Sequence, residues 1–305
     1  MRIVVVGAGG VGGYFGARLA QAGADVTLVA RGAHLDAIRA RGLRVRSAVE
    51  GDYTVAVTAV DKVAGLPAAD AVLLCVKSFD TEAAVEQVRP VVGPETPVLS
   101  LQNGVDNEER IDAVLGAGHA LGGVAYIFAT IEAPGVIAHT FAGRVVLGEM
   151  DGRPTPRAER LRDAFGGAGI PATLSEDIRR VLWEKYLMIA AQAGMTAITR
   201  CPIGVIREAP QPWRMYRLIV EELAALARAS GVALAPDAVA TTLANAEKLA
   251  SHLFSSLHHD LVQGKRLELE ALHGHAVRLG DRLGVPTPTV FAVYAALTPF
   301  GEGKR

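Results

Sequence analysis

The first thirty residues contain an apolar run, a stretch with helical periodicity and a second apolar run. This pattern predicts a strand, a helix and a second strand. Ile3 to Val6 is a β-branched run, Val11 to Ala22 has helical periodicity, and Asp25 to Ala30 is again strand-like. Short apolar runs of this kind are typical of strands buried on both faces of a parallel sheet. The chain therefore begins with a predicted βαβ unit.

The same alternation continues to about residue 174. His119 to Glu149 is rich in strand-forming residues, with turns expected at Gly135 and Gly143. The other predicted strands are Leu43 to Ser47, Tyr53 to Ala59, Ala69 to Val76, Pro97 to Gln102 and Pro171 to Leu174, and the helices are His34 to Arg41, Lys77 to Arg89, Asp106 to Leu115 and Pro156 to Gly167. This pattern predicts one doubly wound α/β unit.

The pattern changes at Ser175, a good helix N-cap, beyond which almost only helical periodicity remains. The predicted helices are Ile178 to Ile198, Pro212 to Ser230, Pro236 to Gln263, Glu268 to Leu283 and Pro288 to Leu297. A second, all-helical domain is the expected result.

A glycine motif joins the first strand to the first helix. Gly7, Gly9 and Gly12 have the spacing G-x-G-x-x-G, in which the first glycine permits the tight turn, the second admits a pyrophosphate and the third allows close packing. The expected cofactor-binding residues of this loop are Gly7, Ala8, Gly9, Gly10, Val11 and Gly12. The alternative is a glycine-rich turn that only packs well. The predicted fold class is α/β, with an N-terminal Rossmann-type dinucleotide-binding domain (1–174) followed by an all-helical C-terminal domain (175–305).

Three residues at predicted strand ends are candidates for the cofactor site. The second strand ends at Arg31 rather than at an acid, which favours NADP(H), because a basic residue accommodates a 2′-phosphate. Lys77 and Asn103 follow two later strands, at the edge where open α/β sheets bind ligands. A solvated loop arginine and a loop lysine are the alternatives for Arg31 and Lys77.

The helical domain holds the candidate catalytic groups. Lys185 lies at the margin of an almost wholly apolar helix, and a buried lysine loses proton affinity and can act as a general acid or base. The alternative is a lysine that extends from the helix edge into water. Ser256 and Glu268 are further polar candidates, although such an acid is often only a capping residue.

Composition excludes several other classes of protein. A net charge of −1, from 31 basic and 32 acidic residues, gives no indication of nucleic-acid binding. Cys75 and Cys201 match no metal-ligand or disulfide spacing, and the histidines form no convincing metal set. No apolar stretch reaches the length of a membrane span and no signal pattern is present, so we expect a cytoplasmic protein. The apolar C-terminal helices are compatible with a homodimer, although helices of this kind also pack within one chain.

The combination of segments resembles the ketopantoate reductase (2-dehydropantoate 2-reductase) family over nearly the whole chain. The segments that carry the resemblance are Gly7-Ala-Gly-Gly-Val-Gly12, Leu74-Cys-Val-Lys77, Gln102-Asn-Gly104, Leu182-Trp-Glu-Lys185, Ser255-Ser256, Leu267-Glu-Leu-Glu270 and Gly284-Val-Pro-Thr-Pro288. The first is common to dinucleotide-binding folds, whereas the Trp-x-Lys and Ser-Ser…Glu segments are more specific.

The resemblance implies roles for individual residues. Lys185 matches the proton donor of the family, and Glu268 matches the acid beside the reaction centre. Lys77 and Asn103 match cofactor contacts, Asn103 also facing the substrate, and Ser256 matches a substrate-binding serine. The implied activity is NADPH-dependent reduction of a small 2-oxo acid to the 2-hydroxy acid.

Three positions depart from the family pattern. Members that reduce ketopantoate carry asparagines where this chain has Ile189, Ala193 and Ile203. Spacing of four places the first two on one helix face with Lys185, so polar contacts of the expected pocket are missing. We therefore expect either 2-dehydropantoate or a more apolar 2-oxo compound as substrate. The alternatives are a dehydrogenase for another hydroxy acid and a non-catalytic NADP(H)-sensing protein.

Overall fold

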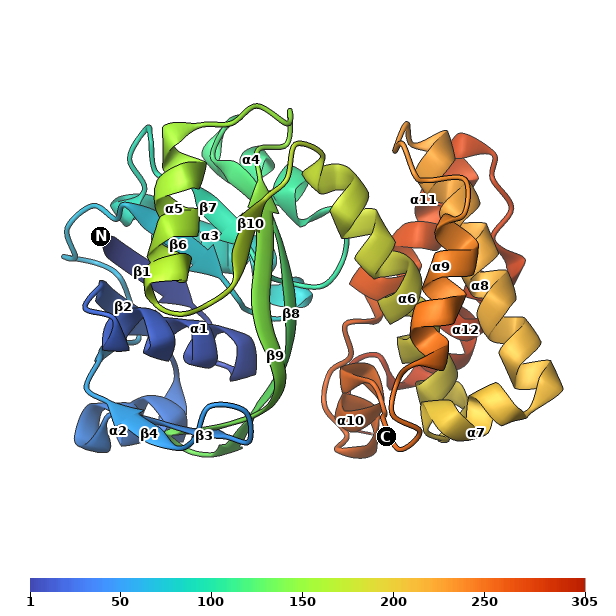
Figure 1. Cartoon of the computed structure of the whole chain (residues 1–305), viewed down its shortest axis with the longest axis horizontal. Coiled ribbons are helices and arrows are strands. Elements are labelled where there is room, and N and C mark those ends of the chain that lie inside the picture. The colour runs from blue at the N-terminus through green and yellow to red at the C-terminus, as the bar shows by residue number, and fades with distance from the viewer. Residues whose placement is uncertain (305) are drawn as a thin grey trace. The chain divides into compact units, whose positions relative to one another are not determined.

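The computed structural model describes residues 1–304, the side chain of Ala142 excepted. The chain divides into two compact units (Figure 1). The first comprises Met1–Gln102 and Asp106–Ile178, and the second comprises Asn103–Val105 and Arg179–Arg305. The α/β class with a helical C-terminal part is thereby confirmed.

The first unit is built on one mixed sheet. Its strands are β1 (Arg2–Val6), β2 (Asp25–Val29), β3 (Leu43–Ser47), β4 (Tyr53–Val55), β5 (Thr58–Val60), β6 (Ala71–Leu74), β7 (Val98–Ser100), β8 (Ala120–Ala133), β9 (Val136–Gly148) and β10 (Ala172–Leu174). Strands β5, β2, β1, β6, β7 and β8 are parallel neighbours in that order. This is the Rossmann order, with its reversal point beside β1.

The long strands β8 and β9 form an antiparallel pair that extends the parallel sheet (Figure 1). Strand β9 also pairs in parallel with β3 and β10, and β3 pairs antiparallel with β4. The sheet of the N-terminal unit is therefore mixed rather than purely parallel.

Helices cover both faces of this sheet. They are α1 (Gly10–Gln21), α2 (Gly32–Arg41), α3 (Thr81–Val88), α4 (Asn107–Leu115) and α5 (Pro156–Gly167), with 3₁₀ turns η1 (Ser78–Asp80) and η2 (Arg89–Val91). Alternate strand residues pack to opposite sides, because successive side chains of a strand point to opposite faces. Helices α1, α2 and α5 share one apolar cluster with the sheet, and α3 and α4 share the other.

Two details of the predicted strands are wrong. Tyr53 to Ala59 is not one strand, because β4 pairs with β3 whereas β5 pairs with β2, and these positions are far apart in the strand order. Gly143 does not end a strand either: it lies inside β9 with φ +126°, next to an irregularity in the pairing with β8. Its Cα faces the Tyr14 ring so closely that a Cβ would lie 2.7 Å from the Tyr14 hydroxyl.

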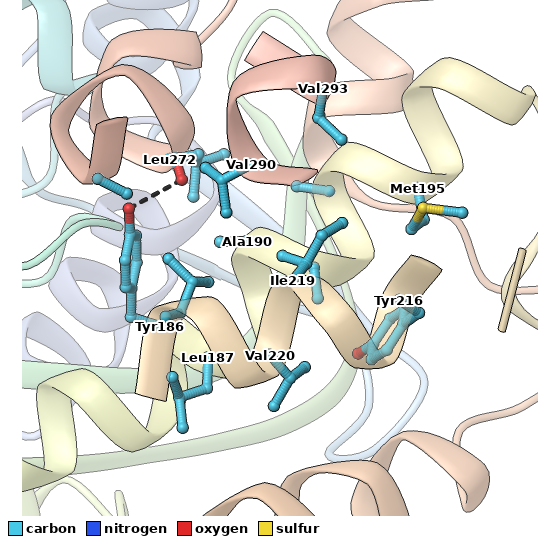
Figure 2. Close-up of a cluster of buried hydrophobic side chains, with 14 of the residues drawn as sticks. Tyr186, Leu187, Ala190, Met195, Tyr216, Ile219, Val220, Leu272, Val290 and Val293 are labelled. Atoms are coloured by element: carbon cyan, nitrogen blue, oxygen red, sulfur yellow. Dashed lines mark hydrogen bonds between the residues drawn. The ribbon is translucent and has the colours of Figure 1, made fainter. Parts of the chain in front are cut away.

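The second unit is helical. Its elements are α6 (Ile178–Thr199), α7 (Ile203–Glu208), α8 (Pro210–Ala229), α9 (Ala238–Glu247), α10 (Ser256–Val262), the π-helical turn η3 (Glu270–Gly274), α11 (His275–Leu283), α12 (Pro288–Leu297) and the 3₁₀ turn η4 (Thr298–Phe300). Helices α6 and α8 both contribute large side chains to its core, among them Tyr186 and Tyr216 (Figure 2). Tyr186, Leu187 and Ala190 of α6 are fully buried, as the apolar periodicity predicts.

The helix predicted over 236–263 is wrong, because the structure has two helices, α9 and α10, separated by residues 248–255. This interruption brings the Ser251 carbonyl to the Gly204 amide and the Leu253 carbonyl to the Ile203 amide. The start of α6 also differs in detail. Ser175 accepts the Asp177 amide with its hydroxyl, and the helix begins at Ile178.

One carboxyl group in the first turn of α4 is buried. The Glu108 side chain is 3% exposed, and neither carboxylate oxygen has a hydrogen-bond donor among the described residues. Burial raises the pKa of Glu108 from its usual 4.5 to about 7. Because the folded pKa is raised, the stability that the protonated form contributes is complete below pH 4.5 and is lost as the pH rises through 7.

We therefore expect Glu108→Gln to stabilise the protein at pH 9 and to change little at pH 4. The gain should be about 3 kcal/mol, since each pKa unit corresponds to about 1.4 kcal/mol. Urea denaturation at both pH values measures it. Glu109→Gln, at the exposed neighbouring position, is the control. Equal stability of Glu108→Gln and the wild type at pH 9 would contradict the buried, proton-binding state.

Candidate functional site

The glycine loop has the geometry that a bound dinucleotide requires. Gly7 has φ +95°, and a Cβ there would lie 2.8 Å from the backbone of Cys75 and Val76. A Cβ on Gly12 would lie 2.2 Å from the Gly7 carbonyl oxygen, so both positions exclude larger residues. A Cβ on Gly9, in contrast, would meet no described atom within 4 Å. The loop is thus tight where it packs and open where a diphosphate approaches a helix N-terminus.

A pocket lies beside this loop, at the carboxyl ends of β1, β2 and β6. It is lined by Val6, Gly7, Ala8, Gly9, Val29, Ala30, Arg31, His34, Val76, Gln87 and Ile131. Of the predicted cofactor contacts, Gly7, Ala8, Gly9 and Arg31 therefore line one pocket. In open α/β sheets this edge, at the reversal of the strand order, is where ligands bind.

Arg31 precedes α2 and has an exposed side chain. Its guanidinium lies 3.3 Å from the carboxylate of Asp80, which belongs to η1. Sequence reasoning missed Asp80, because the pair joins residues 49 positions apart. An anionic group bound by Arg31 would compete with Asp80 for the guanidinium. The exposed ion pair itself contributes little to stability, so its loss would cost little.

The loop after β6 is held by the side chain of Gln102, whose contacts were not predicted. The Gln102 amide donates to the Val76 carbonyl, at 3.0 Å, and to the Thr81 hydroxyl, at 2.9 Å. Lys77 lies between these two contacts, half-buried, directly before η1. Asn103, which follows Gln102, is half-buried and belongs to the compact helical unit.

Lys185 lies on α6 at a partly buried position. Burial lowers its pKa from 10.5 to about 8, against the opposing effect of the negative charge of Glu268. A lysine in this state is protonated at neutral pH, yet it gives up its proton far more readily than an exposed lysine. The structure thus brings Lys185 and Glu268 into electrostatic interaction.

Glu268 is 6% exposed and directly precedes the helix that opens with the π-helical turn η3. Two buried hydrogen bonds join this turn to α6. The Tyr186 hydroxyl donates to the Leu272 carbonyl at 2.8 Å (Figure 2), and His273 Nε2 donates to the Ala190 carbonyl at 3.0 Å. Burial lowers the pKa of His273 to about 4, so the ring is neutral. No sequence signal marks a π-helical turn, and these contacts were not predicted.

The two serines at the start of α10 have different roles. Ser255 caps the helix, accepting the His258 amide at 3.1 Å, and its hydroxyl lies 2.7 Å from that of Thr196. Ser256, the predicted substrate contact, is exposed at the first position of α10. Thr196 is fully buried and also donates to the Gln192 carbonyl, so its hydroxyl is engaged within the helical core.

The three positions that depart from the family pattern all contribute to apolar packing. Ala193 is 3% exposed and Ile203 is fully buried in the helical core, and the partly buried Ile189 packs against the same core. Their side chains therefore offer no hydrogen-bonding groups.

We also searched residues 1–304 for metal sites and for membrane-spanning helices. Within residues 1–304, no group of three or more His, Cys, Asp or Glu side chains is arranged to hold a metal ion. No helix in the same range is long and apolar enough to cross a membrane.

Comparisons with known proteins agree with this arrangement. The family model "Ketopantoate reductase PanE/ApbA" matches residues 3–152, and the model of the corresponding C-terminal domain matches residues 177–300. The chain is similar to a 2-dehydropantoate 2-reductase of Mesorhizobium japonicum, with 33% identity over 317 aligned positions that cover 97% of this chain and 96% of the relative.

Solved structures show the same fold. A PanE/ApbA family ketopantoate reductase from Ralstonia eutropha JMP134 superimposes with a TM-score of 0.91 at 35% identity, covering 99% of this chain and 98% of that one. A ternary structure of D-mandelate dehydrogenase with NADH and anilino(oxo)acetate has the same TM-score at 22% identity, covering 99% and 98%, and shows the likeness of fold alone. With two family models matching most of its length, this chain belongs to the ketopantoate reductase family and is a nicotinamide-dependent oxidoreductase acting on CH–OH groups.

Proposed function

We propose that the protein reduces a 2-oxo acid to the 2-hydroxy acid with NADPH, and that Lys185 is the proton donor. The observation that carries the proposal is the lysine itself, whose pKa burial lowers to about 8 beside the charge of Glu268. A general acid works best when its pKa lies near the working pH. Membership of a family of reductases favours this activity over a non-catalytic, cofactor-sensing role.

The residues of this chain divide the work as follows. The bound nicotinamide supplies the hydride for the carbonyl carbon. The Lys185 ammonium protonates the carbonyl oxygen, and Glu268 keeps that ammonium charged and oriented. Lys77 contacts the cofactor, Asn103 contacts both cofactor and substrate, and the Ser256 hydroxyl contacts the substrate.

The proposed substrate is a 2-oxo acid with an apolar side chain. Ile189 and Ala193 follow Lys185 at spacings of four along α6, so they share its helix face. Neither can bond a substrate hydroxyl, but both can pack against hydrocarbon. The same surface suits the reverse reaction, oxidation of an apolar 2-hydroxy acid, which is the second candidate. A screen of 2-oxo acids for NADPH oxidation and of 2-hydroxy acids for NADP reduction tests both.

Arg31 is the proposed ligand of the 2′-phosphate. We expect NADPH to bind roughly tenfold to a hundredfold more tightly than NADH, since a hydrogen bond to a charged group contributes about 1.5 to 3 kcal/mol. In Arg31→Ala the two affinities should become nearly equal, as titration of the bound dinucleotide fluorescence would show. An unchanged affinity ratio in this variant would leave Arg31 as a solvated loop residue.

The pH dependence of the reduction should reflect the titration of Lys185 and the charge of Glu268 beside it. Because Lys185 must be protonated, we expect kcat/KM to fall about tenfold per pH unit above pH 8. The negative charge of Glu268 raises the pKa of Lys185. Glu268→Gln should therefore move the alkaline limb of the kcat/KM profile to lower pH. Glu270→Gln, two residues away at an exposed position, is the matched control and should leave the limb in place. A limb that stays unmoved in Glu268→Gln would separate Glu268 from the titrating lysine.

A further inference from the structure

His34 joins two distant segments at the dinucleotide pocket. It is the third residue of α2, and its ring lines the pocket together with Ala8 and Gly9. On one side, Nε2 lies 2.8 Å from the Ala8 carbonyl oxygen in the glycine loop. On the other side, Nδ1 lies 3.0 Å from the amide nitrogen of Gly135, in the turn between β8 and β9.

These two contacts fix the tautomer of the ring. A backbone amide can only donate, so Nδ1 accepts from Gly135, and a carbonyl can only accept, so Nε2 carries the hydrogen and donates to Ala8. Burial lowers the pKa of His34, which favours this neutral form. The Gly135 turn is itself held against α2, because a Cβ on Gly135 would lie 2.9 Å from the Cβ of Ala37.

The bond to Ala8 also determines where the next amide points. In a planar trans peptide the carbonyl and the following N–H point in opposite directions. With the Ala8 carbonyl directed at the His34 ring, the Gly9 N–H is directed away from it. Gly9 is the N-cap of α1, so its N–H is one of the four amides that a helix leaves without an intrahelical partner.

We infer that His34 is a positioning residue of the dinucleotide site, which orients the Ala8–Gly9 peptide so that the Gly9 N–H meets the diphosphate. The open space beside Gly9 gives the diphosphate room to approach. The orientation of the Ala8–Gly9 peptide depends on the His34 ring, and the ring is itself held by the Gly135 amide in the β8–β9 turn. The inference rests on dinucleotide binding by this loop and is independent of the role of Lys185.

The test separates the diphosphate from the rest of the cofactor. We would measure the affinity of His34→Leu for NADPH and, by competition, for 2′-AMP, which has the 2′-phosphate but no diphosphate. NADPH binding should weaken roughly tenfold, the size expected for losing one or two net hydrogen bonds. Binding of 2′-AMP should stay within about twofold of the wild type. His34→Gln, whose amide can donate to Ala8, should recover most of the NADPH affinity.

The control is His119→Leu, which removes a similar ring contact, Nδ1 to the Thr96 carbonyl at 3.3 Å, from another part of the same unit. It should bind both ligands as the wild type does. Unchanged NADPH affinity in His34→Leu would overturn the inference, and so would equal weakening of both ligands, which marks a contact to the adenosine. If His34→Leu does not fold, His34→Asn, whose side chain cannot span both contacts, should show the same selective loss. A wild type that binds NADH but not NADPH would refute the proposed cofactor choice instead, and NADH with adenosine would then be the ligand pair.

Discussion

Lys185→Ala should lose turnover by about a hundredfold to ten-thousandfold, the usual contribution of a general acid. Removal of the ammonium leaves the carbonyl oxygen to take its proton from water as the negative charge develops. The cofactor loop and pocket belong to the other compact unit of the chain, so NADPH affinity should be retained. A loss in kcat at unchanged cofactor affinity is the expected pattern, and steady-state kinetics with a fluorescence titration of NADPH would measure it.

The control is Lys248→Ala, which removes an exposed lysine at the end of α9. It should keep wild-type kinetics. Lys185→Arg is a stricter test, because arginine keeps the positive charge but does not release a proton at these pH values. If Lys185→Ala turns over a good substrate within a few-fold of the wild type, Lys185 is a structural lysine at the helix edge and the proposed mechanism is wrong.

Ketopantoate should be a poor substrate beside a 2-oxo acid with an apolar side chain. Burying a hydroxyl or carboxylate without a partner costs about 1 to 3 kcal/mol for each group. Ile189 and Ala193 leave two such groups unbonded, which would lower kcat/KM very roughly a hundredfold to ten-thousandfold if the losses were independent. Thr196 does not replace the missing asparagines, because its hydroxyl bonds to Gln192 and Ser255 inside the helical core.

Kinetics with ketopantoate and a panel of apolar 2-oxo acids would measure this selectivity. Ile189→Asn, at a partly buried position, should raise kcat/KM for ketopantoate and lower it for the apolar compounds. Leu218→Asn, at an exposed position of α8, is the control and should change neither. A ketopantoate efficiency equal to the best of the panel would show that other groups provide the missing bonds.

Features determined by local sequence were predictable. The first strand, the glycine turn and the following helix depend on neighbouring residues, and the predicted strand–turn–helix is present in the structure. The buried position of α6 followed from its apolar composition on all sides, and the family resemblance was confirmed by the matching family models.

Features that depend on distant segments were not predictable from one sequence. The His34 ring is held between Ala8 and Gly135, 26 and 101 positions away, and nothing in the local pattern marks these partners. The break between α9 and α10 was missed because helical periodicity continues across it, whereas backbone contacts to α7 favour the interruption. The roles of Lys77, Asn103 and Ser256 stay predictions.

The π-helical turn after Glu268 makes the chain sensitive to its own length at this place. A π-turn contains one more residue per turn than an α-helical turn, so deleting one residue from 270–274 would let α11 continue as a regular helix. The helix would survive, but Glu268 would be rotated by about 100° around the axis relative to α11, away from Lys185. Variants that lack one residue of this segment should therefore fold but lose activity.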